Sequence, residues 1–110
     1  MPEVLIEFER FDGTDLAAWK LEEKVRNLLD AAHRWQQAPK LLVLSAWNKG
    51  LVSAPEISGL LTLCRKGFKT GVGASVPALH GVSVLFNRLI FQTKVDGTLA
   101  LTHSSCERLQ

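Results

Sequence analysis

The stretch that decides the fold is L-L-V-L-S-A-W, residues 41–47 of a chain of 110 residues. Its apolar side chains follow one another without the alternation of a half-exposed strand, and Asn48-Lys49-Gly50 ends the run. A continuous apolar run of this length, bounded by turn residues, is typical of a strand in a parallel sheet. We therefore expect residues 41–47 to form a strand that is covered on both faces.

The segment before this strand predicts another strand and a long helix. In residues 4–11, Ile6 and Phe8 lie on one side of an extended backbone and two glutamates lie on the other side, which indicates a half-buried strand. Thr14 is expected to cap a helix in which apolar residues recur every three or four positions. Because Pro39 disfavours helical backbone in the residue before it, we expect this helix to end shortly before Pro39.

A second helix signal follows residues 41–47. Ser53 and Glu56 fit a capping box, with Ser53 at the N-cap and Pro55 in the first turn, where no backbone donor is needed. Apolar residues at helical spacing over residues 57–68 then predict a buried stripe, and Gly71 is a natural residue to end the helix.

The last third of the chain is expected to add two strands, each followed by a helix. Pro77 cannot donate to a strand ladder, so the first of these strands should be short or at an edge. Ser83 is the expected cap of the next helix, and Asp96-Gly97 is a turn signal. The expected elements are, in order, a strand over 72–79, a helix over 82–90, a strand over 98–102 and a short helix over 104–110.

Strands and helices that alternate in this way predict the fold class. We expect an α/β fold, with a mostly parallel or mixed sheet of four to five strands and helices packed on it. A length of 110 residues is enough for one hydrophobic core, so residues 1–110 are expected to form a single domain.

The composition excludes several classes of protein. The formal net charge is only +2, and the basic residues do not gather into the strongly basic patch of a nucleic-acid-binding protein. No apolar run is long enough for a membrane span, and the N-terminus does not resemble a signal peptide. Two cysteines are too few for a disulfide framework. We expect a cytoplasmic protein that binds no nucleic acid and inserts into no membrane.

The sequence contains no motif that predicts catalysis or a cofactor. The glycine-rich phosphate-binding fingerprints and the G-x-S-x-G nucleophile motif are absent. His33, His80 and His103 lie far apart in the sequence without the spacing of metal ligands. Cys64 falls on the apolar stripe of the second helix, where a thiol is usually unreactive. We therefore expect no catalytic residue, no metal and no cofactor, and a protein that is not an enzyme.

The order of these elements resembles the STAS family, the sulfate-transporter and anti-sigma-factor-antagonist domains. Residues 41–47 match the strand before the family's signature, and Glu56-Ile57-Ser58-Gly59-Leu60 occupies the place of its Asp-Ser-Ser-Gly-Leu. The chain departs from that signature at Glu56 and at Ile57. The expected later strand, helix, strand and short helix also follow the family's order.

This resemblance implies a function without catalysis. It implies a bacterial regulatory module that binds a partner protein, such as an anti-sigma factor kinase, and that is switched by phosphorylation. The serine before the glycine is the phosphorylated residue of the family, and Ser58 holds that position. The implied partner-binding residues are Ser53, Glu56, Ser58 and Gly59.

Two other functions remain open at this stage. STAS-like domains also serve as accessory subunits of ABC-type lipid transporters, in which the partner would be the transporter ATPase. Three tryptophans are candidate interface anchors for such a role: Trp19, Trp35 and Trp47. The second alternative is a small-molecule-binding protein or enzyme with its site at the carboxyl ends of the strands, at Asn48, Lys49, His80 and His103. A homodimer is compatible with each of these functions.

Overall fold

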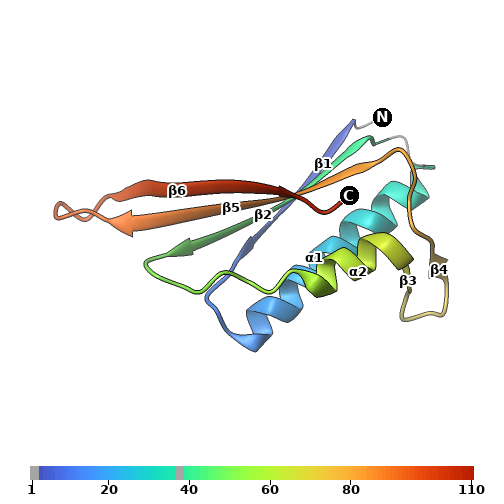
Figure 1. Cartoon of the computed structure of the whole chain (residues 1–110), viewed down its shortest axis with the longest axis horizontal. Helices are drawn as coiled ribbons and strands as arrows, with labels where there is room; N and C mark the ends of the chain where they lie inside the picture. Colours follow the sequence, from blue (N-terminus) through green and yellow to red (C-terminus); the bar gives the residue numbers. More distant parts are fainter. Residues whose placement is uncertain (1–2, 37–38) are drawn as a thin grey trace.

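The protein is built on one four-stranded sheet that carries its helices on a single face (Figure 1). The computed structural model describes residues 3–36 and 39–110. The strand order is β1-β2-β5-β6, in which β1, β2 and β5 are parallel and β6 is antiparallel to β5. The strands of this sheet are β1 (Val4–Arg10), β2 (Leu41–Lys49), β5 (Ser83–Thr93) and β6 (Leu99–Arg108). A mixed α/β fold with helices packed on the sheet is thus confirmed.

The secondary structure of the first half of the chain, as far as Lys49, follows the sequence prediction. The helix α1 (Asp15–Arg34) begins after Thr14, whose hydroxyl accepts a hydrogen bond from the Ala17 amide at 3.1 Å. Its apolar stripe is buried against β1 and β2. The strand β2 follows the predicted residues 41–47 and extends to Lys49.

The second helix starts later than its capping signal predicts. The helix α2 (Ser58–Lys66) begins five positions after Ser53, so the predicted cap at Ser53 is wrong. Residues 51–57 are irregular and lie over the sheet, held partly by Arg88, which donates a hydrogen bond to the Val52 carbonyl at 2.7 Å. The helix ends at Gly67, where φ is +70° and a Cβ would lie against the backbone of Val76, so the predicted end at Gly71 is also wrong.

The strand predicted over residues 72–79 is not part of the main sheet. A small antiparallel hairpin takes its place, formed by β3 (Phe68–Lys69) and β4 (Ser75–Val76). Pro77 directly follows β4, as expected for a residue that cannot donate to the ladder.

Both helices predicted after residue 80 are wrong, because these segments are the strands β5 and β6. The run V-L-F-N-R-L-I-F in residues 84–91 places apolar side chains on both sides of a strand, and the same residues also fit a helical stripe. Pairing with β2 on one side and β6 on the other satisfies the backbone of β5 and selects the strand. The predicted turn at Asp96-Gly97 joins them and is confirmed.

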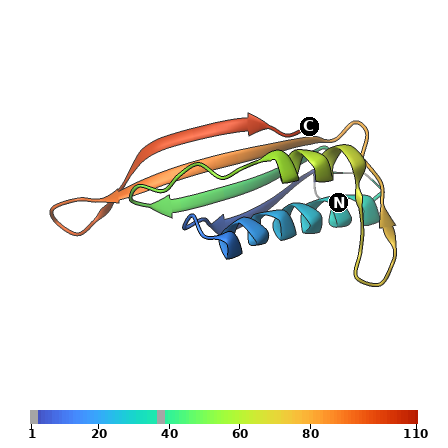
Figure 2. The same cartoon turned by 60° about the horizontal axis from the view of Figure 1, so that its bottom comes forward.

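The hydrophobic core lies between the helices and one face of the sheet. It includes the fully buried Leu42, Leu44 and Val84 of the central strands and the apolar stripe of α1. No helix covers the opposite face in residues 3–36 and 39–110, as Figures 1 and 2 both show. The prediction that residues 41–47 are covered on both faces is therefore wrong for the described part of the chain.

Candidate functional site

The uncovered face of the sheet is the most distinctive surface of the molecule, and we call it the open face. Side chains alternate across a strand, so the residues paired with one another in neighbouring strands share a face. Ile6 pairs with Val43, Val43 with Leu85, and Leu85 with Arg108 across the whole sheet. On the open face several apolar side chains are about half exposed or more: Val4, Ile6, Phe8, Leu99 and Leu101.

A hollow lies in the middle of the open face. Its volume is about 330 Å³, and its lining comes from all four strands: Phe8, Ser45, Trp47, Leu89, Phe91 and Leu99. The lining is almost entirely apolar, because Ser45 is its one residue without an apolar side chain. A hollow of this size accommodates one large apolar side chain of a partner.

One row of paired residues, which includes two polar side chains, crosses the sheet at the hollow. Phe8, Ser45, Asn87 and Cys106 stand next to one another in register. The Asn87 amide donates a hydrogen bond to the Ser45 hydroxyl at 3.3 Å, and Ser45 is only 3% exposed. Because these two polar groups form a hydrogen bond with each other, they can lie within an apolar surface.

The charges of the open face are all positive. Arg10, Lys49 and Arg108 belong to it, and the Arg10 guanidinium lies 5.6 Å from the centre of the Trp47 ring. The strand carboxylates Glu7, Glu9 and Glu107 occupy the alternate positions and therefore point toward the helix side. Glu7 accordingly forms an ion pair with Lys24 of α1 at 3.5 Å.

The residues implied by the family resemblance lie elsewhere, at the start of α2. Ser53, Glu56 and Ser58 are exposed, and Gly59 is half-buried. The Ser58 amide donates a hydrogen bond to the Glu56 carboxylate at 3.0 Å, so these two residues are brought together. Ser53 stands apart in the loop, since no hydrogen bond among the described residues joins it to α2.

Gly59 faces the Glu22 side chain of α1. A Cβ at this position would meet the Glu22 carboxylate, which is the flexible end of its side chain. Glu22, Glu56, Asp15 and Trp19 also line a hollow of about 240 Å³ between the two helices. The surface around Ser58 is therefore acidic, in contrast to the open face.

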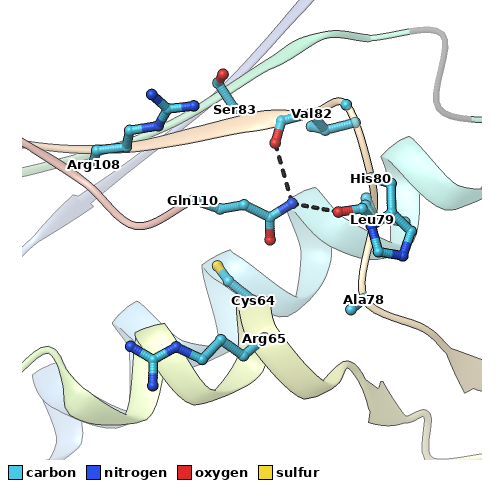
Figure 3. Close-up of a pocket in the computed structure, with 10 residues that line it drawn as sticks. Cys64, Arg65, Ala78, Leu79, His80, Val82, Ser83, Arg108 and Gln110 are labelled. Atoms are coloured by element: carbon cyan, nitrogen blue, oxygen red, sulfur yellow. Dashed lines mark hydrogen bonds between the residues drawn. The ribbon is translucent and has the colours of Figure 1, made fainter.

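A third hollow, of about 510 Å³, lies at the amino end of β5 and is drawn in Figure 3. Gln110 stands in it and donates hydrogen bonds to the Leu79 and Val82 carbonyls. Cys64 is its only thiol, and burial raises the pKa of Cys64 to about 11, so the thiol is protonated and a poor nucleophile at neutral pH. Burial therefore does not activate the Cys64 thiol as a nucleophile.

The residues expected at the carboxyl ends of the strands are dispersed. Asn48 is 2% exposed and donates a hydrogen bond to the Gly50 carbonyl at 2.8 Å, whereas Lys49 faces the other way. His80 precedes β5 and so lies at the opposite end of the sheet, and His103 is on β6 opposite Ile90. The predicted clustering of these four residues is wrong.

Neither a metal centre nor a known family identifies the protein. No group of three or more potential metal ligands gathers among the residues that the structure describes. None of the described helices combines the length and apolarity needed to cross a bilayer. No protein-family model, curated protein or solved structure matches this chain. Strands stand where the two helices were expected after residue 80, so the predicted order of elements is not kept in that part of the chain.

Sequence reasoning missed the open face, although the signal was present. Ile6 and Phe8 alternate with glutamates, and this pattern predicts a half-buried strand with its apolar side against the core. In the structure Phe8 is 64% exposed, and it is the glutamate side of β1 that faces α1. Only the position of α1 distinguishes the two orientations.

Proposed function

We propose that this protein is a non-enzymatic interaction module that binds a partner protein through the open face. The observation that carries the proposal is a sheet whose parallel strands are covered on one face only, with apolar side chains exposed on the other. Parallel sheets almost always have both faces covered. Contiguous exposed apolar patches on folded proteins mark interaction sites.

The energetics of burial support this proposal. Removing apolar surface from water is favourable by about 25 cal/mol per Å². A partner layer that covers Ile6, Phe8 and Leu101 gains this energy without any rearrangement of the sheet, because these side chains are already about half exposed or more. The hollow beside Trp47 adds a concave centre, the geometry in which interface residues contribute most.

Site-specific photo-crosslinking tests the proposal. A benzophenone amino acid replaces Ile6 on the open face or, as the control, Trp19 on the exposed side of α1. After irradiation in cells, we expect a crosslinked protein at Ile6 and none at Trp19. Crosslinks that form only at Trp19, or at neither position, would contradict binding through the open face.

A phosphorylation switch at Ser58 is a second proposal, and it follows from the STAS resemblance. Two observations favour it: Ser58 is exposed, and it is the first residue of α2, where the helix dipole is strongest. A phosphate there carries a charge of about −1.5 to −2 and would compete with Glu56 for the Ser58 amide. It would thus alter the charge of this surface without unfolding the domain.

Phosphate mapping and paired variants test the switch. Protein isolated from its own cells is analysed by mass spectrometry, and Ser58→Ala and Ser58→Glu are compared for partner binding. We expect phosphate on Ser58 and weaker binding of an anti-sigma factor kinase or a transporter ATPase by Ser58→Glu. Ser75→Glu is the matched control, because Ser75 is exposed in β4 and is not among the residues that the resemblance implies for partner binding. Equal binding by all variants would refute the switch.

A further inference from the structure

We infer that the open face binds an amphipathic helix of another protein, with acidic residues on either side of an apolar stripe. This inference rests on the proposed interaction function and specifies the partner's chemistry. Three features of the face determine it: the sign of its charges, the position of its hollow and its dimensions.

Charge complementarity requires an acidic partner. Arg10 and Lys49 lie at the carboxyl ends of β1 and β2, and Arg108 lies on β6 toward the other end of the sheet. The strand positions of the open face hold no carboxylate in the described residues. Beyond the end of β1, the Asp12 carboxylate interacts electrostatically with Arg10, but none of the three cations forms an ion pair in the described part of the chain. A partner that is acidic beside its apolar stripe would pair with them, and like charges would be repelled.

The position of the hollow suits a helix that lies along the central strands. Its lining includes Trp47 of β2 and Leu89 of β5, flanked by Phe8 and Leu99 from the two edge strands. A large side chain on the apolar stripe would insert there, while the turns before and after it contact the rest of the face. Helix-in-groove recognition uses anchors of this kind.

The dimensions of the face also match a helix. Nine to eleven residues per strand in β2 and β5 span roughly 30 Å at about 3.3 Å per residue. A helix of about 20 residues has the same length, and α1 on the covered face is a helix of 20 residues. A docked helix would complete the helix–sheet–helix layers that parallel strands usually have.

A second copy of this chain fits the face less well. Face-to-face pairing would bring Arg10, Lys49 and Arg108 of each copy to an interface without a carboxylate on the facing strands. Self-association is therefore an outcome of the test that would overturn the inference.

Two designed peptides of about 21 residues provide the probe. They share one leucine stripe with a central phenylalanine and differ only in the flanking residues, which are glutamates in one peptide and lysines in the other. Fluorescence anisotropy with the full chain, at about 50 mM salt, measures their affinities. We expect the glutamate peptide to bind at least about tenfold more tightly, with the difference shrinking as salt is added.

Variants locate the binding to the open face. Arg10→Glu combined with Lys49→Glu should reverse the preference between the two peptides. Phe8→Ser should weaken both peptides, whereas Trp19→Ser on the helix layer should weaken neither. Cys106 belongs to the open face and is exposed, so the bound glutamate peptide should slow its alkylation. Circular dichroism of each variant establishes that the sheet and helices are retained.

The possible results are distinct. Equal affinity for both peptides, or tighter binding of the lysine peptide by the unmodified chain, would overturn the acidic helix. The inference would also be overturned if sedimentation velocity showed a dimer of the unmodified chain and Phe8→Ser dissociated this dimer. If neither peptide binds but Ile6 still crosslinks a protein, the helix inference fails and the proposed function stands. If Ile6 crosslinks nothing, the proposed function itself fails.

Discussion

The two faces of one sheet differ in what covers them, although both are rich in apolar side chains. Leu42, Leu44 and Val84, which point toward α1 and α2, are completely buried, whereas Ile6 and Phe8 on the open face are 51% and 64% exposed. An apolar side chain stabilises the fold only to the extent that another layer removes it from water. The covered face therefore supplies most of the burial that stabilises the fold, and the open face leaves apolar surface exposed to solvent.

The two faces should differ most in the free energy of unfolding that is lost when one side chain is truncated on each face. Leu44→Ala leaves a cavity under α1 and should cost about 2–5 kcal/mol of unfolding free energy. Ile6→Ala removes a half-exposed side chain and should cost less than half as much. Urea denaturation measures both. Equal losses would mean that another molecule covers the open face in solution and would break the comparison.

The two cysteines report on the faces separately. Cys64 is buried on the covered side, where burial raises its pKa to about 11, and Cys106 is exposed on the open face. Cys64 reacts with iodoacetamide only after local opening, so Cys106 should react at least about a hundredfold faster at pH 7.5. Mass spectrometry of each cysteine over time measures the ratio. Similar rates would show that α2 opens readily.

Raising the pH should lower the free energy of unfolding through the ionisation of Cys64. The pKa of Cys64 is higher in the folded protein than in the unfolded chain, so its contribution to stability is present below the unfolded pKa and is lost as pH rises toward 11. Cys64→Ala should reduce this loss between pH 9 and about 11, measured by urea denaturation at each pH. Cys106→Ala is the control that should leave the pH dependence unchanged.

A smaller loss of unfolding free energy is expected when the N-cap of α1 is removed. Thr14→Ala removes the hydroxyl that accepts from the Ala17 amide and should cost about 1 kcal/mol. Thr98→Ala is a matched control, because Thr98 follows the same Asp-Gly pair in the β5–β6 turn but caps no helix. If Thr98→Ala were as destabilising as Thr14→Ala, capping would not explain the loss.

The smallest effect is expected at the edge of the open face. Arg10→Gln removes the cation above the Trp47 ring and should cost about 0.5 kcal/mol, because the pair is solvent-exposed. The tryptophan fluorescence should change at the same time, which Lys94→Gln, an exposed position that adjoins no tryptophan in the sequence, should not cause. A loss larger than that of Thr14→Ala would show that Arg10 contributes to the core of the fold.

The sequence predicted correctly those elements whose signals lie within a short stretch of the chain. Thr14, the stripe of α1 and the apolar run of β2 are local patterns, and each element formed where it was expected. Ser53 and Glu56 also form a local capping pattern, but α2 begins only at Ser58. The loop before α2 is held by Arg88, which donates a hydrogen bond to the Val52 carbonyl, a contact over 36 positions in the sequence.

The second half of the chain shows where local patterns stop being sufficient. Residues 84–91 fit both a helical stripe and a strand, and Ser104 to Glu107 fits a capping box in a segment that is a strand. A seven-residue helix has little stability of its own, whereas pairing β6 with β5 satisfies the backbone of both strands. The choice between helix and strand was made by a neighbouring strand and not by the segment itself.

The sequence by itself determined the β1–α1–β2 unit, the α/β class and the turn at Asp96-Gly97, because these depend on periodicity and on turn residues. Only the tertiary structure decided that β5 and β6 are strands and that both helices pack on one face. Those outcomes depend on which segments meet in space. The exposure of Phe8, and with it the open face, is a consequence of where α1 packs, and no pattern within β1 contains that information.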